Sequence, residues 1–236
     1  MCRESEGALK NLGHIVCPNT IKAILLRNGI TPAPDRGRRT PWKTFLKAHA
    51  NSIFAADFFT TEVWTMRGLA THYTLFVIHH ATRAVQIVGT TVHPGELFMD
   101  QIAKLLTDPV DGFLRNAKHL IIDRDTKFTE KFRSILKDAG VDTIRIPASA
   151  PNCNALAERF VKSIKDECLN KMIFFGTASL DRALAAYGTH FLQERNHQGI
   201  GNELISPTVP VGQLDGRVVC RERLGGLLRF YHRRAA

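Results

Sequence analysis

Three acidic residues stand in apolar surroundings, where an isolated carboxylate is costly to desolvate. Asp57 lies inside the apolar run 53–59, Asp123 directly follows the apolar run 120–122, and Glu158 lies in a segment of helical character. Hard carboxylate oxygens are the ligands that Mg²⁺ prefers in proteins. Acids brought together in this way can hold two Mg²⁺ ions about 3.5–4 Å apart, which clamp the attacking and leaving oxygens of a phosphodiester. The three acids therefore indicate a site for phosphodiester chemistry.

Each acid taken alone has a more common explanation, because salt bridges and helix caps account for most such residues. The helical segment around Glu158 adds a second signal. Asn154, Lys162 and Lys165 stand about one turn apart on the helix face that carries Glu158, and Arg159 adjoins them. This stripe predicts one acid at a metal, with Asn154, Arg159, Lys162 and Lys165 beside it as contacts to the backbone of a nucleic-acid substrate.

The segments that must position these acids read as a mixed sheet with helices packed on it. Apolar runs separated by turn-prone residues predict a meander of three strands, followed by a helix and then a strand–helix–strand unit. The predicted strands are 52–64, 73–80, 84–92, 118–123 and 141–146, and the predicted helices are 96–106, 129–139, 155–170 and 180–193. Asp57 shares its strand face with Ala55 and Phe59. Asp123 ends a buried strand, which is where ligands bind in α/β sheets.

The flanking regions divide the chain into four parts. Residues 1–28 predict two short helices, the second opening at Pro18, and this spacing fits a truncated helix-turn-helix as well as a plain helical hairpin. Residues 29–50 form a basic linker rich in proline and glycine, in which Arg38 and Arg39 can follow a phosphate backbone. Residues 51–207 form the larger domain, which contains the three acids. The basic tail 208–236 is either an arm that grips phosphate or a packed extension of the surface.

The composition favours a polyanionic partner. The chain has 236 residues, a net charge of +10 and 44% hydrophobic residues, with a pI near 9.7. Nucleic acid is the first candidate and an anionic membrane surface the second, while a solvated basic surface without a ligand is the alternative. No apolar run approaches the length of a membrane span, and the five cysteines form no CxxC pair. We therefore expect a cytoplasmic protein with reduced thiols and no zinc site.

The ordered motifs around the acids resemble those of the DDE-type insertion-sequence transposases, whose core is similar to that of retroviral integrases. Thirty-four residues separate Asp123 from Glu158, close to the spacing that gives this family its usual name. The resemblance covers roughly residues 51–207. It rests on three motifs, Ala55-Ala56-Asp57-Phe58-Phe59-Thr60, Ile122-Asp123-Arg124-Asp125-Thr126-Lys127-Phe128 and Pro151-Asn152-Cys153-Asn154-Ala155-Leu156-Ala157-Glu158-Arg159-Phe160.

The resemblance implies an RNase H-like core, an α/β fold with a five-stranded mixed sheet flanked by helices. It implies Asp57, Asp123 and Glu158 as the ligands of two Mg²⁺ or Mn²⁺ ions that cleave the ends of a transposon and join them to target DNA. Partners would be double-stranded DNA and further copies of the chain, as a homodimer or larger assembly. The location would be the nucleoid of a prokaryotic cell. One departure is Asp125, which stands where many relatives have glycine and is the alternative second acid.

Two other functions fit the same residues. A nuclease would share the acids but release nicked DNA without joining it. A catalytically inactive, truncated transposase would bind DNA and perform no chemistry.

Overall fold

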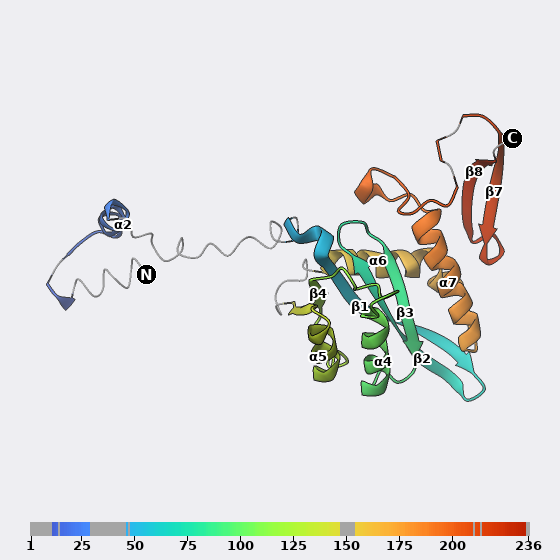
Figure 1. The fold of residues 1–236 in the computed structure, drawn as a ribbon, viewed down its shortest axis with the longest axis horizontal. Helices are drawn as coiled ribbons and strands as arrows, with labels where there is room; N and C mark the ends of the chain where they lie inside the picture. Colours follow the sequence, from blue (N-terminus) through green and yellow to red (C-terminus); the bar gives the residue numbers. More distant parts are fainter. Residues whose placement is uncertain are drawn as a thin grey trace. The chain divides into compact units, whose positions relative to one another are not determined.

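The computed structural model describes residues 11–13, 15–28, 46, 48–146, 154–209, 211–212 and 214–234. They belong to two compact units, Met1–Ala48 and His49–Ala236, which are treated separately below (Figure 1). No helix among the described residues is long and apolar enough to cross a membrane.

In the first unit, helix α2 spans Pro18–Arg27 and opens at the predicted proline, whose fixed φ suits the first turn of a helix. Ile21 is buried, whereas Ile24, three residues further along the helix, is 51% exposed. The partner helix predicted before it falls largely outside the described residues, so the helix-turn-helix is not confirmed. Arg38 and Arg39 also lie outside the described residues.

The second unit is built on a mixed sheet with the strand order β3-β2-β1-β4-β5. The first three strands form the predicted antiparallel meander, and β4 and β5 add to β1 in parallel. The strands are β1 (Ile53–Thr65), β2 (Gly68–His79), β3 (Val85–Thr91), β4 (His119–Ile122) and β5 (Asp142–Arg145). The expected five-stranded RNase H-like sheet is therefore confirmed. A two-residue strand that was not predicted, β6 (Phe174–Phe175), pairs with the far end of β1.

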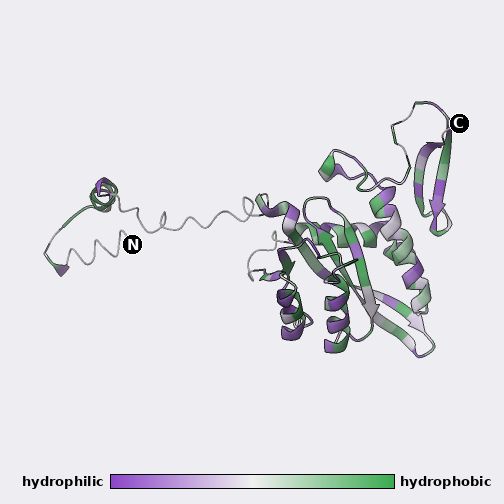
Figure 2. Ribbon diagram, in the orientation of Figure 1, coloured by the Kyte–Doolittle hydropathy of each residue, from purple (hydrophilic) through white to green (hydrophobic). Residues whose placement is uncertain are grey.

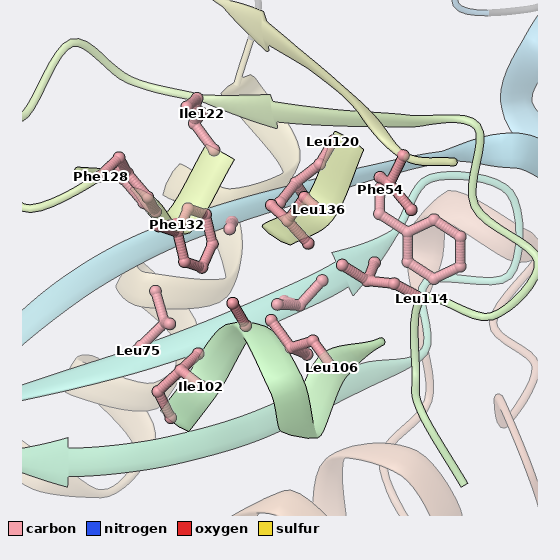
Figure 3. Packing of buried hydrophobic residues seen from close by; sticks show 14 of the residues in the cluster. Phe54, Leu75, Ile102, Leu106, Leu114, Leu120, Ile122, Phe128, Phe132 and Leu136 are labelled. Atoms are coloured by element: carbon pink, nitrogen blue, oxygen red, sulfur yellow. The ribbon is translucent and has the colours of Figure 1, made fainter. Parts of the chain in front are cut away.

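One face of this sheet is covered by α4 (Glu96–Leu106) and α5 (Glu130–Asp138) (Figure 1). Alternate residues of β1, β2 and β4 point into this layer, where they meet the apolar sides of the two helices (Figure 3). Thr129 is the N-cap of α5, and its hydroxyl accepts a hydrogen bond from Phe132 N, 3.1 Å away. Phe132 is in turn fully buried against the sheet.

The other face of the sheet is covered by α6 (Ala155–Glu167) and α7 (Thr177–Gln193). Phe160 of α6 lies at the centre of this second core, with its ring 4.6 Å from the ring of Phe76 and 5.0 Å from that of Phe191. Both helices are amphipathic, and their colours alternate between hydrophobic and hydrophilic bands (Figure 2). Because Phe59 packs against Phe76 on this same face, the alternation of β1 also directs Asp57 toward α6.

The described part of the C-terminal tail is a β-hairpin of β7 (Arg217–Arg223) and β8 (Leu228–Arg234). Glu194, which directly follows α7, is buried and accepts hydrogen bonds from Arg221 and Arg223. These two arginines therefore fit the interpretation of the tail as a packed extension of the surface. Among the described residues, short 3₁₀ helices lie at Ala50–Ser52, Leu169–Lys171, Gln198–Ile200 and Leu224–Gly226.

Candidate active site

Asp57 lies in the middle of the central strand β1, partly buried, and both of its carboxylate oxygens accept hydrogen bonds. Oδ1 accepts from its neighbour Phe58 N at 2.7 Å, and Oδ2 accepts from Asn154 Nδ2 at 3.3 Å. Asn154 is the residue before α6, so the contact joins two segments that are far apart in the sequence. The strand thus delivers the carboxylate to the beginning of the helix that carries Glu158.

Asp123 and Asp125 follow the end of β4 in a tight turn. Asp123 Oδ1 accepts a hydrogen bond from Asp125 N at 3.0 Å, and Asp125 forms an ion pair with Lys127. Burial alone would raise the pKa of Asp125, but the hydrogen bonds from Lys127 outweigh it and hold the pKa below its ordinary value. Asp125 therefore has a cationic partner within its own turn, whereas Asp123 forms no ion pair with any residue that the structure describes.

Asp57, Asp123, Asp125 and Glu158 lie close enough to interact electrostatically. Burial raises the pKa of Asp57 to about 6, and the negative charges of Asp123, Glu158 and Asp125 add to the rise, against the backbone hydrogen bond from Phe58. The acids come from β1, from the turn after β4 and from α6. The negative charges of the two other predicted acids, and of Asp125, therefore act on the carboxylate of Asp57.

The oxygen atoms at this point suit a hard divalent cation. Besides the carboxylates, the buried Asn154 Oδ1 has no hydrogen-bond partner and adds a carbonyl oxygen beside Asp57. A cation would also relieve the mutual repulsion that raises the pKa of Asp57. Within the described part of the chain, however, no three His, Cys, Asp or Glu side chains are grouped to hold a metal ion. The oxygens of Asp57 and Asp123 accept protein hydrogen bonds instead.

The predicted phosphate contacts are divided between two sides of α6. Lys162 is exposed and Lys165 half-buried, and both lie within about 40° of Glu158 around the helix axis. Arg159 is also exposed but lies about 100° away, next to Gly199. Asn154 was predicted to contact DNA, yet it is buried and positions Asp57.

Sequence reasoning missed the role of Lys127. Besides pairing with Asp125, its ammonium group lies 5.7 Å from the centre of the Phe58 ring and 5.1 Å from that of Tyr73. The only signal in the sequence was the position of this lysine two residues after an acid. The ion pair explains how the turn accommodates Asp125 beside Asp123.

The repulsion at Asp57 predicts that the acid destabilises the metal-free fold. Its folded pKa of about 6 exceeds the ordinary value of 3.8, so ionising Asp57 opposes folding at pH above 6. We expect Asp57→Asn to raise the free energy of unfolding by about 1–3 kcal/mol at pH 8 in EDTA. The difference should shrink as pH falls from 6 through 3.8, because the folded wild-type protein then binds the proton.

Urea denaturation at pH 8 and at pH 4 measures this effect. The matched control is Glu62→Gln, which alters an exposed carboxylate on the same strand that accepts a hydrogen bond from Thr71. It should change stability by less than about 0.5 kcal/mol. An Asp57→Asn variant less stable than wild type at pH 8 would contradict the clustering of the acids.

Comparison with known proteins yields one family match, over residues 139–203, to the integrase core domain family. That segment contains Glu158, α6 and α7. No curated protein matches the chain.

Among solved structures, the integrase catalytic core of HTLV-2, in complex with magnesium, is 13% identical with a TM-score of 0.49, covering 66% of this chain and 93% of that one. The catalytic core of BIV integrase is 14% identical with a TM-score of 0.47, covering 66% and 91%. A simian T-cell lymphotropic virus intasome, in complex with a PP2A regulatory subunit, is 12% identical with a TM-score of 0.46, covering 76% and 66%. All three TM-scores lie below 0.5, so the assignment rests on the family match and on the motifs and strand order of the chain itself. On these grounds residues 139–203 are similar to an integrase core domain.

Proposed function

We propose that this protein is a metal-dependent DNA strand transferase of a mobile element. The observation that carries the proposal is the position of Asp57, which accepts a hydrogen bond from Asn154 at the start of α6 and is repelled by the charges of Asp123, Glu158 and Asp125. Structural acids are normally neutralised by cations, whereas this cluster retains an excess of negative charge in a partly buried place. Because uncompensated negative charge of this kind does not stabilise the fold, we infer that the acids act on a substrate.

In the proposed site Asp57, Asp123 and Glu158 hold Mg²⁺ or Mn²⁺, with two ions for the full reaction. Bound there, the metal ions would supply a Lewis acid to the phosphodiester and an activated oxygen nucleophile. The chain itself contributes position: Asn154 holds Oδ2 of Asp57, and β1 fixes the side of the sheet to which that carboxylate points. Asp125 is the alternative second acid, and it forms an ion pair with Lys127 in the turn after β4.

The proposed substrate is double-stranded DNA, as both transposon ends and target. Arg159, Lys162 and Lys165 would contact its backbone, and the net charge of +10 favours such a partner. Joining two ends of DNA calls for at least two active sites, so we propose a homodimer or larger assembly on DNA, in the cytoplasm with the nucleoid. One solved neighbour is an integrase catalytic core in complex with magnesium, and another is part of an intasome.

A strand-transfer assay tests this proposal. The substrates are labelled duplexes taken from the DNA that flanks the gene, with a supercoiled plasmid as target, in Mg²⁺ or Mn²⁺ and with EDTA as the control. Joined product that depends on the metal supports the proposal. Nicked product without joining would identify a nuclease, and DNA binding without either product would identify an inactive DNA-binding relic.

A further inference from the structure

A second polar cavity lies on another side of α6, away from the acids. It has a volume of about 490 Å³ and is bounded by the β2–β3 turn, by α6 and by the segment that follows α7. Its apolar wall includes Ile78, Phe160 and Phe191, and its cationic side chains are Arg83, Arg159 and Arg195. No acidic residue lines it.

Arg83 occupies this cavity in a costly arrangement. Its backbone has a φ of +65°, in the left-handed region that glycine and asparagine tolerate far better. Its Nη1 is buried and has no hydrogen-bond partner among the described residues, although buried guanidinium nitrogens are normally satisfied. The rest of the turn is well braced, because the Thr82 hydroxyl bonds both His79 Nδ1 and Ala84 N. The fold therefore holds an arginine here at a cost that no described contact offsets.

The positive charge of the cavity is also uncompensated. Arg195 is neutralised, since its Nη2 donates to Glu167 Oε1 at 2.7 Å. Neither Arg83 nor Arg159 forms an ion pair with a residue in the described ranges. Burial lowers the pKa of Arg83, and the neighbouring charge of Arg159 lowers it further. Two like charges facing one cavity are the usual arrangement for a bound anion.

We propose that this cavity binds a phosphate group of a DNA strand between Arg83 and Arg159. A guanidinium pair offers the planar donors that phosphate oxygens accept, and the apolar wall can pack against a sugar or base. The cavity is larger than one phosphate needs and is of the size that holds a small molecule, so it has room for the attached nucleoside. This inference rests on the proposed function in one respect only, namely that the phosphate belongs to DNA. Because α6 carries Glu158 about 100° around its axis from Arg159, a strand held here would be positioned with respect to the acids.

Fluorescence anisotropy with the full chain tests the site, using a labelled duplex of mixed sequence across a series of salt concentrations. We expect Arg83→Gln to weaken binding about fivefold and to reduce the slope of log affinity against log salt by about one. Arg159→Gln should act similarly, and the double variant should lose less than the product of the two, because both arginines contact the same phosphate. The matched control is Arg182→Gln, an exposed arginine on α7 outside the cavity.

The thermal stability of Arg83→Asn separates a binding role from a structural one. Asparagine tolerates the positive φ and removes the buried, unpartnered nitrogen, so the DNA-free variant should melt at the same temperature as wild type or about 2–4 °C higher. Its affinity for the duplex should nevertheless fall. A variant that melts lower and binds DNA normally would show that Arg83 supports the turn, and would overturn the proposal.

A second probe, inorganic phosphate, distinguishes this site from the proposed function. If wild type binds no duplex but phosphate raises its melting temperature in a manner that depends on Arg83, the anion site stands and the strand-transferase proposal falls. If strand transfer and DNA affinity are unchanged in Arg83→Gln, the anion site falls and the enzyme stands. Equal losses of DNA affinity in Arg83→Gln and Arg182→Gln would show that only the net positive charge of the protein matters. That result would also overturn the proposed site.

Discussion

Asp57→Asn and Glu158→Gln should each reduce strand transfer by about 10³-fold or more, because each removes a charged ligand while preserving the shape of the side chain. Affinity for DNA should be unchanged or tighter, since the substitutions remove negative charge from a surface that approaches phosphate. The rate of joined-product formation in Mn²⁺ and Mg²⁺, with anisotropy for binding, measures both quantities. The two variants test acids from different parts of the chain, one on β1 and one on α6.

Two controls make the result specific. Glu62→Gln on β1 and Asp166→Asn on α6 remove exposed carboxylates from the same two elements and should leave the rate within about threefold of wild type. If Asp57→Asn retains strand transfer while a control variant loses it, the acids have been misassigned.

The pair Asp123→Asn and Asp125→Asn then identifies the second acid. The ion pair with Lys127 already engages Asp125, so we expect the large loss for Asp123→Asn. The reverse result would transfer that role to Asp125.

The second large effect concerns Glu194, which attaches the C-terminal hairpin to the end of α7. Its side chain is 1% exposed and meets Arg221 at 3.1 Å and Arg223 at 2.7 Å. Burial alone would raise the pKa of Glu194, but hydrogen bonds from Arg223, Arg221 and His190 outweigh it and hold the pKa at about 2. We expect Glu194→Gln to lower the free energy of unfolding by about 3 kcal/mol, as for a broken buried ion pair. Hydrogen exchange of the hairpin amides should accelerate with it.

The pH dependence of this contribution has a definite sign. The folded pKa lies below the ordinary value of 4.5, so the stabilisation is fully present above pH 4.5 and is lost as pH falls from there toward 2. The matched control is Glu222→Gln, because Glu222 pairs with Arg229 at 3.1 Å while both side chains are about half exposed. That variant should lose at most about 1 kcal/mol. Equal losses in the two variants would mean that the buried ion pair does not stabilise the docking of the hairpin.

The sequence predicted the core sheet because its strands carry strong apolar patterns. The predicted helix 96–106 coincides with α4, and the alternation around Asp57 placed its carboxylate on the correct face. The hairpin was missed because its arginines obscured the alternation of Leu228 and Phe230, which are the buried residues of β8. Strand β6 is too short to leave any pattern.

The sequence predicted the acids of the site, but it did not predict the residues that contact them. Acids in apolar runs are visible as exceptions, whereas Lys127 and Arg83 are ordinary basic residues in turns. Their roles depend on a backbone angle at Arg83 and on the ring positions around Lys127, which are properties of tertiary structure. Asn154 was recognised as part of a motif, but its contact with Asp57 spans 97 residues of sequence.

The central position of β1 has a consequence for the order in which the chain folds. β1 pairs first with its sequence neighbour β2, and then with β4 and β6, which come much later in the chain. Local pairings close faster than distant ones, so we expect the meander to form before the second and third acids arrive. The mutual repulsion of the acids then arises only in the last step, when most of the apolar surface is already buried. Synthesis can therefore complete the scaffold before the charged centre opposes it.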